Sequence, residues 1–430
     1  MADNRIPTEV ELVYEVMPCL AVHAAQLPKD VQPHPCTYFR KWGTYHSYDY
    51  VENGPPKQRG IVQDACYLGR APLVPELLSG CRKAPIMAVG INPNLPGWWP
   101  FSRNSLNPLF DDYKQYAHYF RYRGVDKLQL PKADYEKYGG GSDDSPFSDF
   151  ELNVPEDQNG KRPIDVELQD QQMYEKYQEL LDALAERQGW QGHKLVVGED
   201  LAYGNMVACP SAKWSTQPTV GLPAQLIMST DERNGIVTEC FRERRYFLRQ
   251  LFQSLPSILL AFSQNTANAL LNEVRPHLVG DVPKPNASVA DLMKMNVRLR
   301  FGKLSDGSVV EARILFAPHP TGDKQHYEAA KPTVIGQLAE EAEAGRLAYN
   351  PNTKHLARVR GACVFCTMLE IGPCDYIEEI EPLALTAGLT SAGMLPTEVL
   401  TEKRAQAAML NEFIQSVPSV EFAWAESDDQ

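Results

Sequence analysis

The chain has 430 residues, of which 43% are hydrophobic and 23% charged, a balance typical of globular proteins with a sizeable core. We find no apolar run near the ~18 residues that a membrane span needs, and the first residues lack the pattern of a secretory signal. We therefore expect a cytoplasmic protein with no membrane partner. In that compartment the nine cysteines are expected to be thiols or metal ligands rather than disulfides.

Acidic side chains are unevenly distributed along the chain. The formal net charge of −13 disfavours a strong duplex-DNA binder, which usually carries a basic face. By segment, the net charge is +3 for residues 1–133, −11 for 134–200, +4 for 201–325 and −9 for 326–430. The two segments that hold the motifs described below are therefore slightly basic.

The first half of the chain is predicted to hold one strand between two irregular segments. Residues 1–60 mix Pro, aromatic and polar residues without a period, which predicts an irregular N-terminal extension. The apolar run 85–90 predicts a buried parallel strand that enters a loop at its final glycine. Residues 134–200 are predicted to be an acidic insertion, solvated at 139–163 and helical from about 166 to 187.

Strands and helices alternate in the second half. The predicted strands are 201–209, 255–262, 297–302 and 308–316, and the predicted helices are 237–254 and 266–274. The helix at 237–254 has a predicted basic side made of Arg242, Arg244, Arg245 and Arg249. This alternation predicts an α/β fold, a three-layer α/β/α sandwich with a short, mostly parallel central sheet. The domain is expected to cover residues 61–330, followed by a C-terminal cysteine-containing extension at 331–430.

An asparagine follows one of the predicted strands, and another lies near the end of the next. Gly90 and Pro93 permit a sharp turn that brings the backbone close to a base, and the Asn92 amide between them both donates and accepts hydrogen bonds. Asn205 lies near the end of the next strand, from which an amide can read the edge of a pyrimidine. The alternatives are a plain strand-to-loop turn at Asn92 and hydrogen bonding of Asn205 to local backbone groups.

A third loop follows the last predicted strand. Two prolines hold His319 in an extended turn, from which an imidazole can donate a hydrogen bond to a developing oxyanion. Thr321, Gly322 and Lys324 offer a hydroxyl, a backbone N–H and a positive charge to a phosphate. The alternative is an ordinary proline-rich turn. In a mostly parallel sheet, all three loops lie at the carboxyl ends of the strands, where ligands bind.

The order of these segments resembles the uracil-DNA glycosylase superfamily. The turn Gly90–Pro93 is similar to the first motif of the mismatch-specific thymine/uracil branch, and 205–210 to the strand-end asparagine segment of the iron–sulfur uracil glycosylases. Residues 255–271 are similar to the third strand and its helix, and 319–322 to the closing His-Pro-Ser motif. The resemblance covers roughly residues 60–330, in the order of the family.

The resemblance implies a DNA-repair enzyme that binds DNA and hydrolyses the N-glycosidic bond of uracil or another altered base. It implies that Asn92 positions the attacking water, Asn205 reads the flipped pyrimidine, His319 bonds the base O2 and Thr321 holds the strand backbone. Asn94 replaces a glycine of the family motif, and a neutral Asn92 in place of an acid predicts slow catalysis. Two other functions remain open: a non-catalytic nucleic-acid or nucleotide binding module of the same fold, and a hydrolase of free nucleotides.

The cysteines suggest a metal site. Cys363, Cys366 and Cys374 have the spacing C-x2-C-x7-C, in which two thiolates can grip one metal ion from a tight turn. Cys66 precedes the first motif at about the distance of one cluster cysteine in the iron–sulfur glycosylases, and Cys36 is an alternative fourth ligand. The resemblance implies a [4Fe–4S] cluster, with zinc as an alternative. The alternative to a metal site is that these cysteines are buried free thiols.

Overall fold

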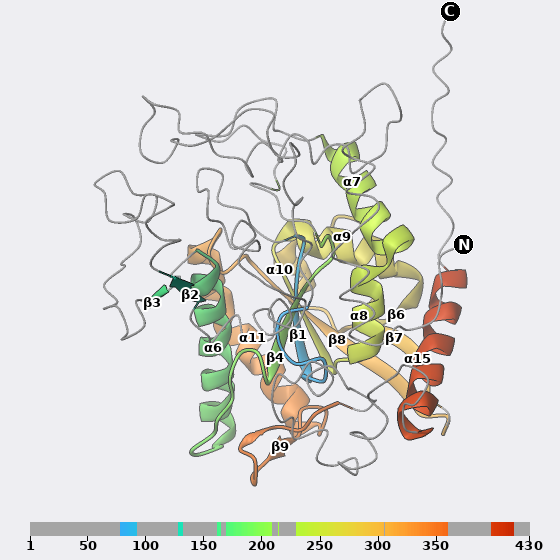
Figure 1. Cartoon of the computed structure of the whole chain (residues 1–430). Helices are drawn as coiled ribbons and strands as arrows, with labels where there is room; N and C mark the ends of the chain where they lie inside the picture. Colours follow the sequence, from blue (N-terminus) through green and yellow to red (C-terminus); the bar gives the residue numbers. More distant parts are fainter. Residues whose placement is uncertain are drawn as a thin grey trace, which may run out of the picture.

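The structure is a computed structural model of the chain and describes residues 78–92, 128–131, 161–164, 169–208, 214, 229–304, 306–359 and 397–416. A six-stranded sheet with the order β4-β1-β5-β8-β7-β6 forms its centre (Figure 1). Its strands are β1 (Ile86–Gly90), β4 (Leu201–Asn205), β5 (Ile258–Phe262), β6 (Leu278–Gly280), β7 (Val297–Lys303) and β8 (Val309–Ala317). The predicted N-terminal extension at 1–60 lies outside the described residues.

The strands β4, β1, β5 and β8 run parallel to one another, and β7 is antiparallel to both β8 and β6. The central strands are buried on both faces, which explains their continuous apolar sequences. The predicted mostly parallel sheet is thus confirmed, as is the hairpin of β7 and β8. The strand predicted from residue 255 begins only at Ile258, because Leu255 has a φ of 47° and ends the preceding helix.

One face of the sheet is covered by two long helices, α6 (Gln169–Gln188) and α11 (Lys324–Glu343). They lie side by side and share a buried cluster with alternate residues of the parallel strands (Figure 1). In α6 the buried apolar residues recur at helical spacing, at Tyr177, Leu180, Leu181 and Leu184, so this face of the helix contacts the sheet.

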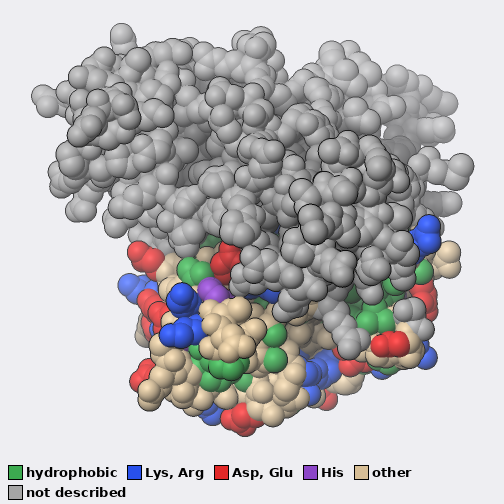
Figure 2. All heavy atoms as spheres, turned by 60° about the horizontal axis from the view of Figure 1, so that its bottom comes forward, with side chains coloured by type: hydrophobic (Ala, Val, Ile, Leu, Met, Phe, Trp, Pro, Cys, Tyr) green, Lys and Arg blue, Asp and Glu red, His purple; other side chains and the backbone are tan. Residues whose placement is uncertain are grey.

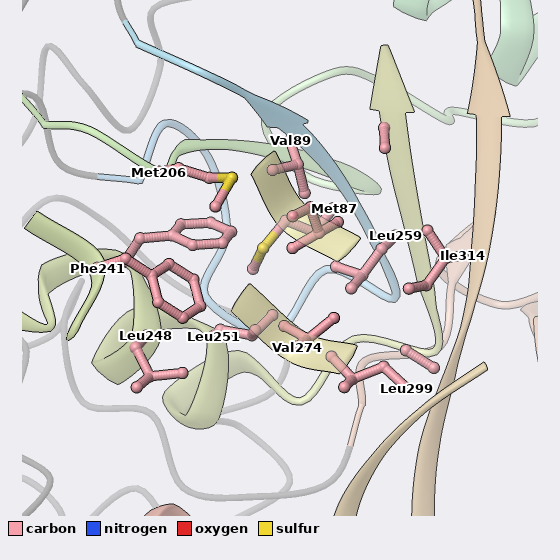
Figure 3. Close-up of a cluster of buried hydrophobic side chains, with 14 of the residues drawn as sticks. Met87, Val89, Met206, Phe241, Leu248, Leu251, Leu259, Val274, Leu299 and Ile314 are labelled. Atoms are coloured by element: carbon pink, nitrogen blue, oxygen red, sulfur yellow. The ribbon is translucent and has the colours of Figure 1, made fainter. Parts of the chain in front are cut away.

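The opposite face carries the second helical layer. It comprises α7 (Thr230–Thr238), the π-helix η5 (Glu239–Arg244), α8 (Tyr246–Ser254), α9 (Gln264–Val274), α10 (Val289–Leu292) and α15 (Thr397–Ser416). Figure 3 shows Met87 and Val89 of β1 meeting Phe241 of η5 and Leu251 of α8 in this core. The predicted three-layer α/β/α sandwich is therefore confirmed.

Two predicted domain boundaries disagree with the packing of α6 and α11 on the sheet. The acidic insertion was expected to extend to residue 200, yet α6 lies within it and is packed on the sheet. The C-terminal extension was expected to begin at residue 331, which falls inside α11. The first boundary was predicted from the acidic charge along the sequence and the second from the extent of the family resemblance. Both helices expose a charged face while burying an apolar one. The core therefore includes both helices.

Smaller elements complete the described part of the chain. The strands β2 (Leu128–Pro131) and β3 (Lys161–Ile164) form an antiparallel pair, and a short 3-10 helix η6 spans Arg275–His277. The strands β9 (Tyr349–Asn350) and β10 (His355–Leu356) form a second antiparallel pair. None of the described helices is both long and apolar enough to cross a bilayer.

The predicted helix at 237–254 is broken. The π-helix η5 ends at Arg245, whose φ of 61° is left-handed, and α8 starts one residue later. Two of the four arginines expected on a basic side are paired with buried carboxylates, Arg242 with Glu273 and Arg244 with Glu239. Arg249 is itself only 6% exposed. This segment therefore does not form the open basic side that the sequence predicts.

Candidate functional site

The three predicted loops leave the sheet at one edge. Gly90 lies opposite Asn205 in the pairing of β1 with β4, and Phe262 lies opposite Ala317 in the pairing of β5 with β8. Backbone pairing continues beyond the strands, because the N–H of Val207 donates to the carbonyl of Ile91 at 2.9 Å. The loop that bears Asn92 therefore adjoins the segment after Asn205.

His319 follows β8 by two residues at the same edge. Since β5 alone separates β1 from β8, the ends of these two strands are about 10 Å apart, which is two strand spacings. Side chains alternate between the faces of a strand, so Asn205 lies on the same face as Tyr203, the face covered by α6 and α11. The helix that starts after the His319 loop is α11 itself. Asn205 and His319 thus lie at the same edge and beside the same helical layer.

Asn205 is held by a buried hydrogen bond. The hydroxyl of Tyr203 donates to Oδ1 of Asn205 at 2.8 Å, and the asparagine is 5% exposed. The bond occupies the space beside Gly90, where a Cβ would lie 2.0 Å from the tyrosine oxygen and 2.6 Å from Oδ1. Glycine at position 90 is therefore required by this close approach, in addition to any role in the turn.

The loop after β8 sets the tautomer of His319. Its Nδ1 accepts hydrogen bonds from the backbone N–H of Gly322 at 2.9 Å and of Thr321 at 3.3 Å. Backbone amides only donate, so Nδ1 presents its lone pair and the neutral ring carries its proton on Nε2. The ring is thereby arranged to donate a hydrogen bond from Nε2.

The charge of His319 follows from its surroundings. Burial lowers the pKa of this imidazole below its ordinary value, and the nearby Asp323 carboxylate opposes that shift without cancelling it. The neutral form therefore dominates at neutral pH. A neutral imidazole that donates from Nε2 suits an oxygen on which negative charge develops.

The loop groups predicted to contact a phosphate are partly used within the loop itself. The backbone N–H groups of Thr321 and Gly322 are directed at Nδ1 of His319, so the loop uses them internally. Thr321, Gly322 and Lys324 are exposed, but the Thr321 hydroxyl also lies 3.3 Å from Nδ1 of His319, which leaves the Lys324 ammonium group as the predicted phosphate contact at the surface. The expected N–H contact from Gly322 to a phosphate is thus replaced by a contact that orients the histidine.

Ser263 is a residue of this edge that the sequence analysis missed. It follows β5, and its N–H donates to the carbonyl of Ala317 at 2.9 Å. Its φ of 83° and ψ of 153° lie in a region that glycine normally occupies, and its hydroxyl accepts from the N–H of Thr266 to begin α9. A serine at a strand end before a helix is a sequence signal for a cap, but its strained backbone has no sequence signal.

The remaining predicted residues are incompletely described. Asn92 is partly exposed at the end of the described segment 78–92, and Pro93 lies outside it. The proposed metal ligands Cys66, Cys363, Cys366 and Cys374 also lie outside the described residues, as does Cys36. Within the described part, no three His, Cys, Asp or Glu side chains are grouped to hold a metal ion.

No protein-family model matches the chain, and no curated protein sequence matches it.

Proposed function

We propose that this protein hydrolyses the N-glycosidic bond of uracil or another altered base in DNA, as the uracil-DNA glycosylase superfamily does. The observation that carries the proposal is the shared edge: Asn205 ends one parallel strand there, and Asn92 and His319 follow two others. Ligands of open α/β sheets bind at this edge. The geometry of His319 supports the proposed chemistry, because its Nε2 proton is free of the loop contacts that hold Nδ1.

In this proposal each polar group has one task. Cleavage of the bond develops positive charge on the sugar and negative charge on the departing base. A preorganised donor at the base O2, here Nε2 of His319, lowers such a barrier by about 3–4 kcal/mol. Asn205 reads the base after it has left the stack, and Asn92 holds the attacking water. Because Asn92 cannot act as a general base near neutral pH, the reaction is expected to be slow.

The direct test is excision from uracil-containing oligonucleotides, single-stranded and double-stranded, read as strand cleavage after alkali. We expect cleavage by the wild type, and a loss of about a hundredfold or more in Asn92→Ala and His319→Ala at unchanged melting temperature. His193→Ala is the matched control, because this histidine lies in the loop at the far end of α6. Excision that survives in both site variants would contradict the proposed roles.

The charges favour one alternative, a hydrolase or binding module for a free nucleotide or nucleoside. Such a ligand needs no basic face, and Arg242 and Arg244 are already paired with buried carboxylates. Figure 2 shows acidic and basic side chains intermixed on the described part of the face that carries β9, at the end of α11 away from the His319 loop. Release of free base from nucleosides or nucleotides, without excision from any oligonucleotide, would favour this alternative.

The predicted cofactor is a metal site made of four cysteines. We propose that Cys66, Cys363, Cys366 and Cys374 hold a [4Fe–4S] cluster, with zinc as the alternative, on the strength of their spacing and the family resemblance. Protein purified without oxygen is expected to show an absorbance shoulder at about 400 nm, as thiolate-ligated iron–sulfur clusters do. Protein with neither this shoulder nor bound zinc would leave the four cysteines as thiols.

A further inference from the structure

A fully buried carboxylate lies at the end of the sheet opposite the candidate site. It belongs to Asp200, which immediately precedes β4. Its Oδ2 accepts hydrogen bonds from the backbone N–H of Val196 at 2.9 Å and from Nδ1 of His355 at 2.8 Å. Its Oδ1 accepts from the backbone N–H of Leu356 at 2.7 Å. His355 and Leu356 form β10, so this carboxylate joins the start of β4 to a segment that comes 155 residues later.

The segment that bears His355 is a short hairpin with an exposed turn at 351–352, packed at this end of the sheet (Figure 1). Leu356 is buried in the core cluster under α6 and α11, and the ring of Tyr349 in β9 stacks on Trp190 at 4.8 Å between centroids. Beyond β10, the N–H of Val359 donates to the carbonyl of Lys83, just before β1. The hairpin therefore contacts the chain in front of both β4 and β1.

The surroundings of His355 favour its charged form. The hydrogen bond to Asp200 raises the pKa of the imidazole, and the opposing effects of burial and of the Arg358 guanidinium do not cancel this rise. Within the described residues, the charged groups that act on His355 are Asp200 and Glu199, from the turn before β4, and Arg358, from its own segment. The side chain of His355 is 18% exposed, so its proton can exchange with solvent.

The direction of the pH dependence follows from this raised pKa. His355 binds its proton more tightly in the closed hairpin than after the hairpin has opened, so protonation favours the closed form. This stabilisation is fully present below the ordinary histidine pKa of about 6.5 and is lost as the pH rises through the raised pKa. A neutral ring still donates from Nδ1, so the contact weakens without disappearing.

We propose that Asp200 and His355 form a pH-sensitive clasp, which holds residues 349–359 against the start of β4 under mildly acidic conditions and loosens as the pH rises. The proposal does not depend on the proposed function, because the clasp lies at the opposite end of the strands from Asn205 and His319.

Hydrogen exchange read by mass spectrometry, corrected for intrinsic exchange rates, measures the opening of residues 349–359 between pH 6 and pH 9. In the wild type we expect opening to increase by about threefold or more over this range, while peptides from β5 stay constant. His355→Asn offers an amide N–H to Asp200 without a titrating charge, so its opening should not depend on pH. His193→Asn is the matched control, because Nδ1 of His193 accepts from the backbone N–H of Leu195. This control should keep the wild-type pH dependence.

The outcomes decide the proposal in either direction. Equal pH dependence in the wild type and in His355→Asn overturns it, as does a wild-type hairpin whose opening does not change with pH. If His355→Asn does not fold, proton NMR of the wild type decides. The histidine ring signal that is missing in His355→Gln must then titrate with a pKa above the ordinary value of about 6.5. Titration at or below that value overturns the proposal.

Discussion

Gly90 illustrates how one residue at the sheet edge constrains its neighbours. Its missing side chain leaves the space in which Tyr203 bonds Asn205. Replacement by alanine places a Cβ 2.0 Å from the tyrosine oxygen, so the hydrogen bond or the strand has to move. The sequence predicts that Gly90 is needed for the turn after β1. The structure adds that a side chain at this position would clash with Tyr203 and Asn205 of β4, more than a hundred residues later in the sequence.

We therefore expect Gly90→Ala to lower the free energy of unfolding by about 1–3 kcal/mol, the usual cost of overpacking a core. Urea unfolding followed by circular dichroism measures this change. Gly336→Ala in α11 is the control, because its Cβ would meet only a side-chain nitrogen of Arg187 at 3.7 Å. The control gains helix propensity and should be neutral or more stable. Equal stability of both variants would refute the packing role of Gly90.

The pH dependence of activity follows from His319. Burial lowers its pKa, so the neutral ring that donates from Nε2 persists until the pH falls below the ordinary histidine range. The unfolded chain takes up the proton first, so this residue also makes folding less favourable as the pH falls below about 6.5.

We expect kcat/KM for excision to be level near neutral pH and to fall only under more acidic conditions. A pH–rate profile of the wild type measures this, and the residual activity of His319→Gln should lack the acid limb. A wild-type rate that rises as the pH drops through 6 would contradict a neutral histidine donor.

At the scale of elements, one buried carboxylate joins α11 to the antiparallel part of the sheet. Glu341 is fully buried and pairs with Arg298 of β7 at 3.0 Å, with Arg313 of β8 at 2.9 Å, and with Arg346. Burial alone raises the pKa of this carboxyl, but the hydrogen bonds from Arg346 and Arg313 outweigh it and hold the pKa below its ordinary value. The carboxylate is therefore ionised in the folded protein.

Glu341→Gln should lower the free energy of unfolding by about 3 kcal/mol, because Arg298 loses its buried counter-charge and Arg313 keeps only that of Glu340, whose side chain is exposed. Denaturant unfolding at pH 7 measures the loss, and Glu343→Gln on the exposed side of the same helix is the control. The difference between wild type and Glu341→Gln should shrink as the pH falls through the lowered pKa of Glu341, since the stabilising charge is then protonated. A difference independent of pH would show that the charge is not what stabilises this contact.

Element boundaries were predictable where hydrophobic periodicity was strong. The strand β1 and the hairpin of β7 and β8 follow the predicted ranges closely, whereas β4 begins at the predicted residue but ends at Asn205, four residues before the predicted end. The helix predicted at 237–254 failed because its apolar spacing continues across a π-turn, and the left-handed Arg245 that breaks it carries no sequence signal. The assignment of α6 to an insertion failed because acidic charge marks only the exposed side of a helix.

For the whole molecule, charge sets the expected mode of DNA contact. The net charge is −13, and two arginines beside α8 are neutralised by buried carboxylates. We expect few phosphate contacts, about three, so that affinity for a uracil-containing duplex falls roughly 10–50-fold between 50 and 200 mM salt. Binding of free uracil should hardly change over that range. A fall above about a thousandfold would indicate the broad basic face that the charges argue against.

The sequence by itself determined the order of strands and helices and the three polar loops, because apolar periodicity and Gly/Pro punctuation are local properties of the chain. Only the tertiary structure decided that Tyr203 bonds Asn205 beside Gly90, and that the loop after β8 leaves the His319 proton on Nε2. Strand neighbours, buried contacts and loop conformations depend on packing between segments far apart in sequence. No local pattern of residues encodes them.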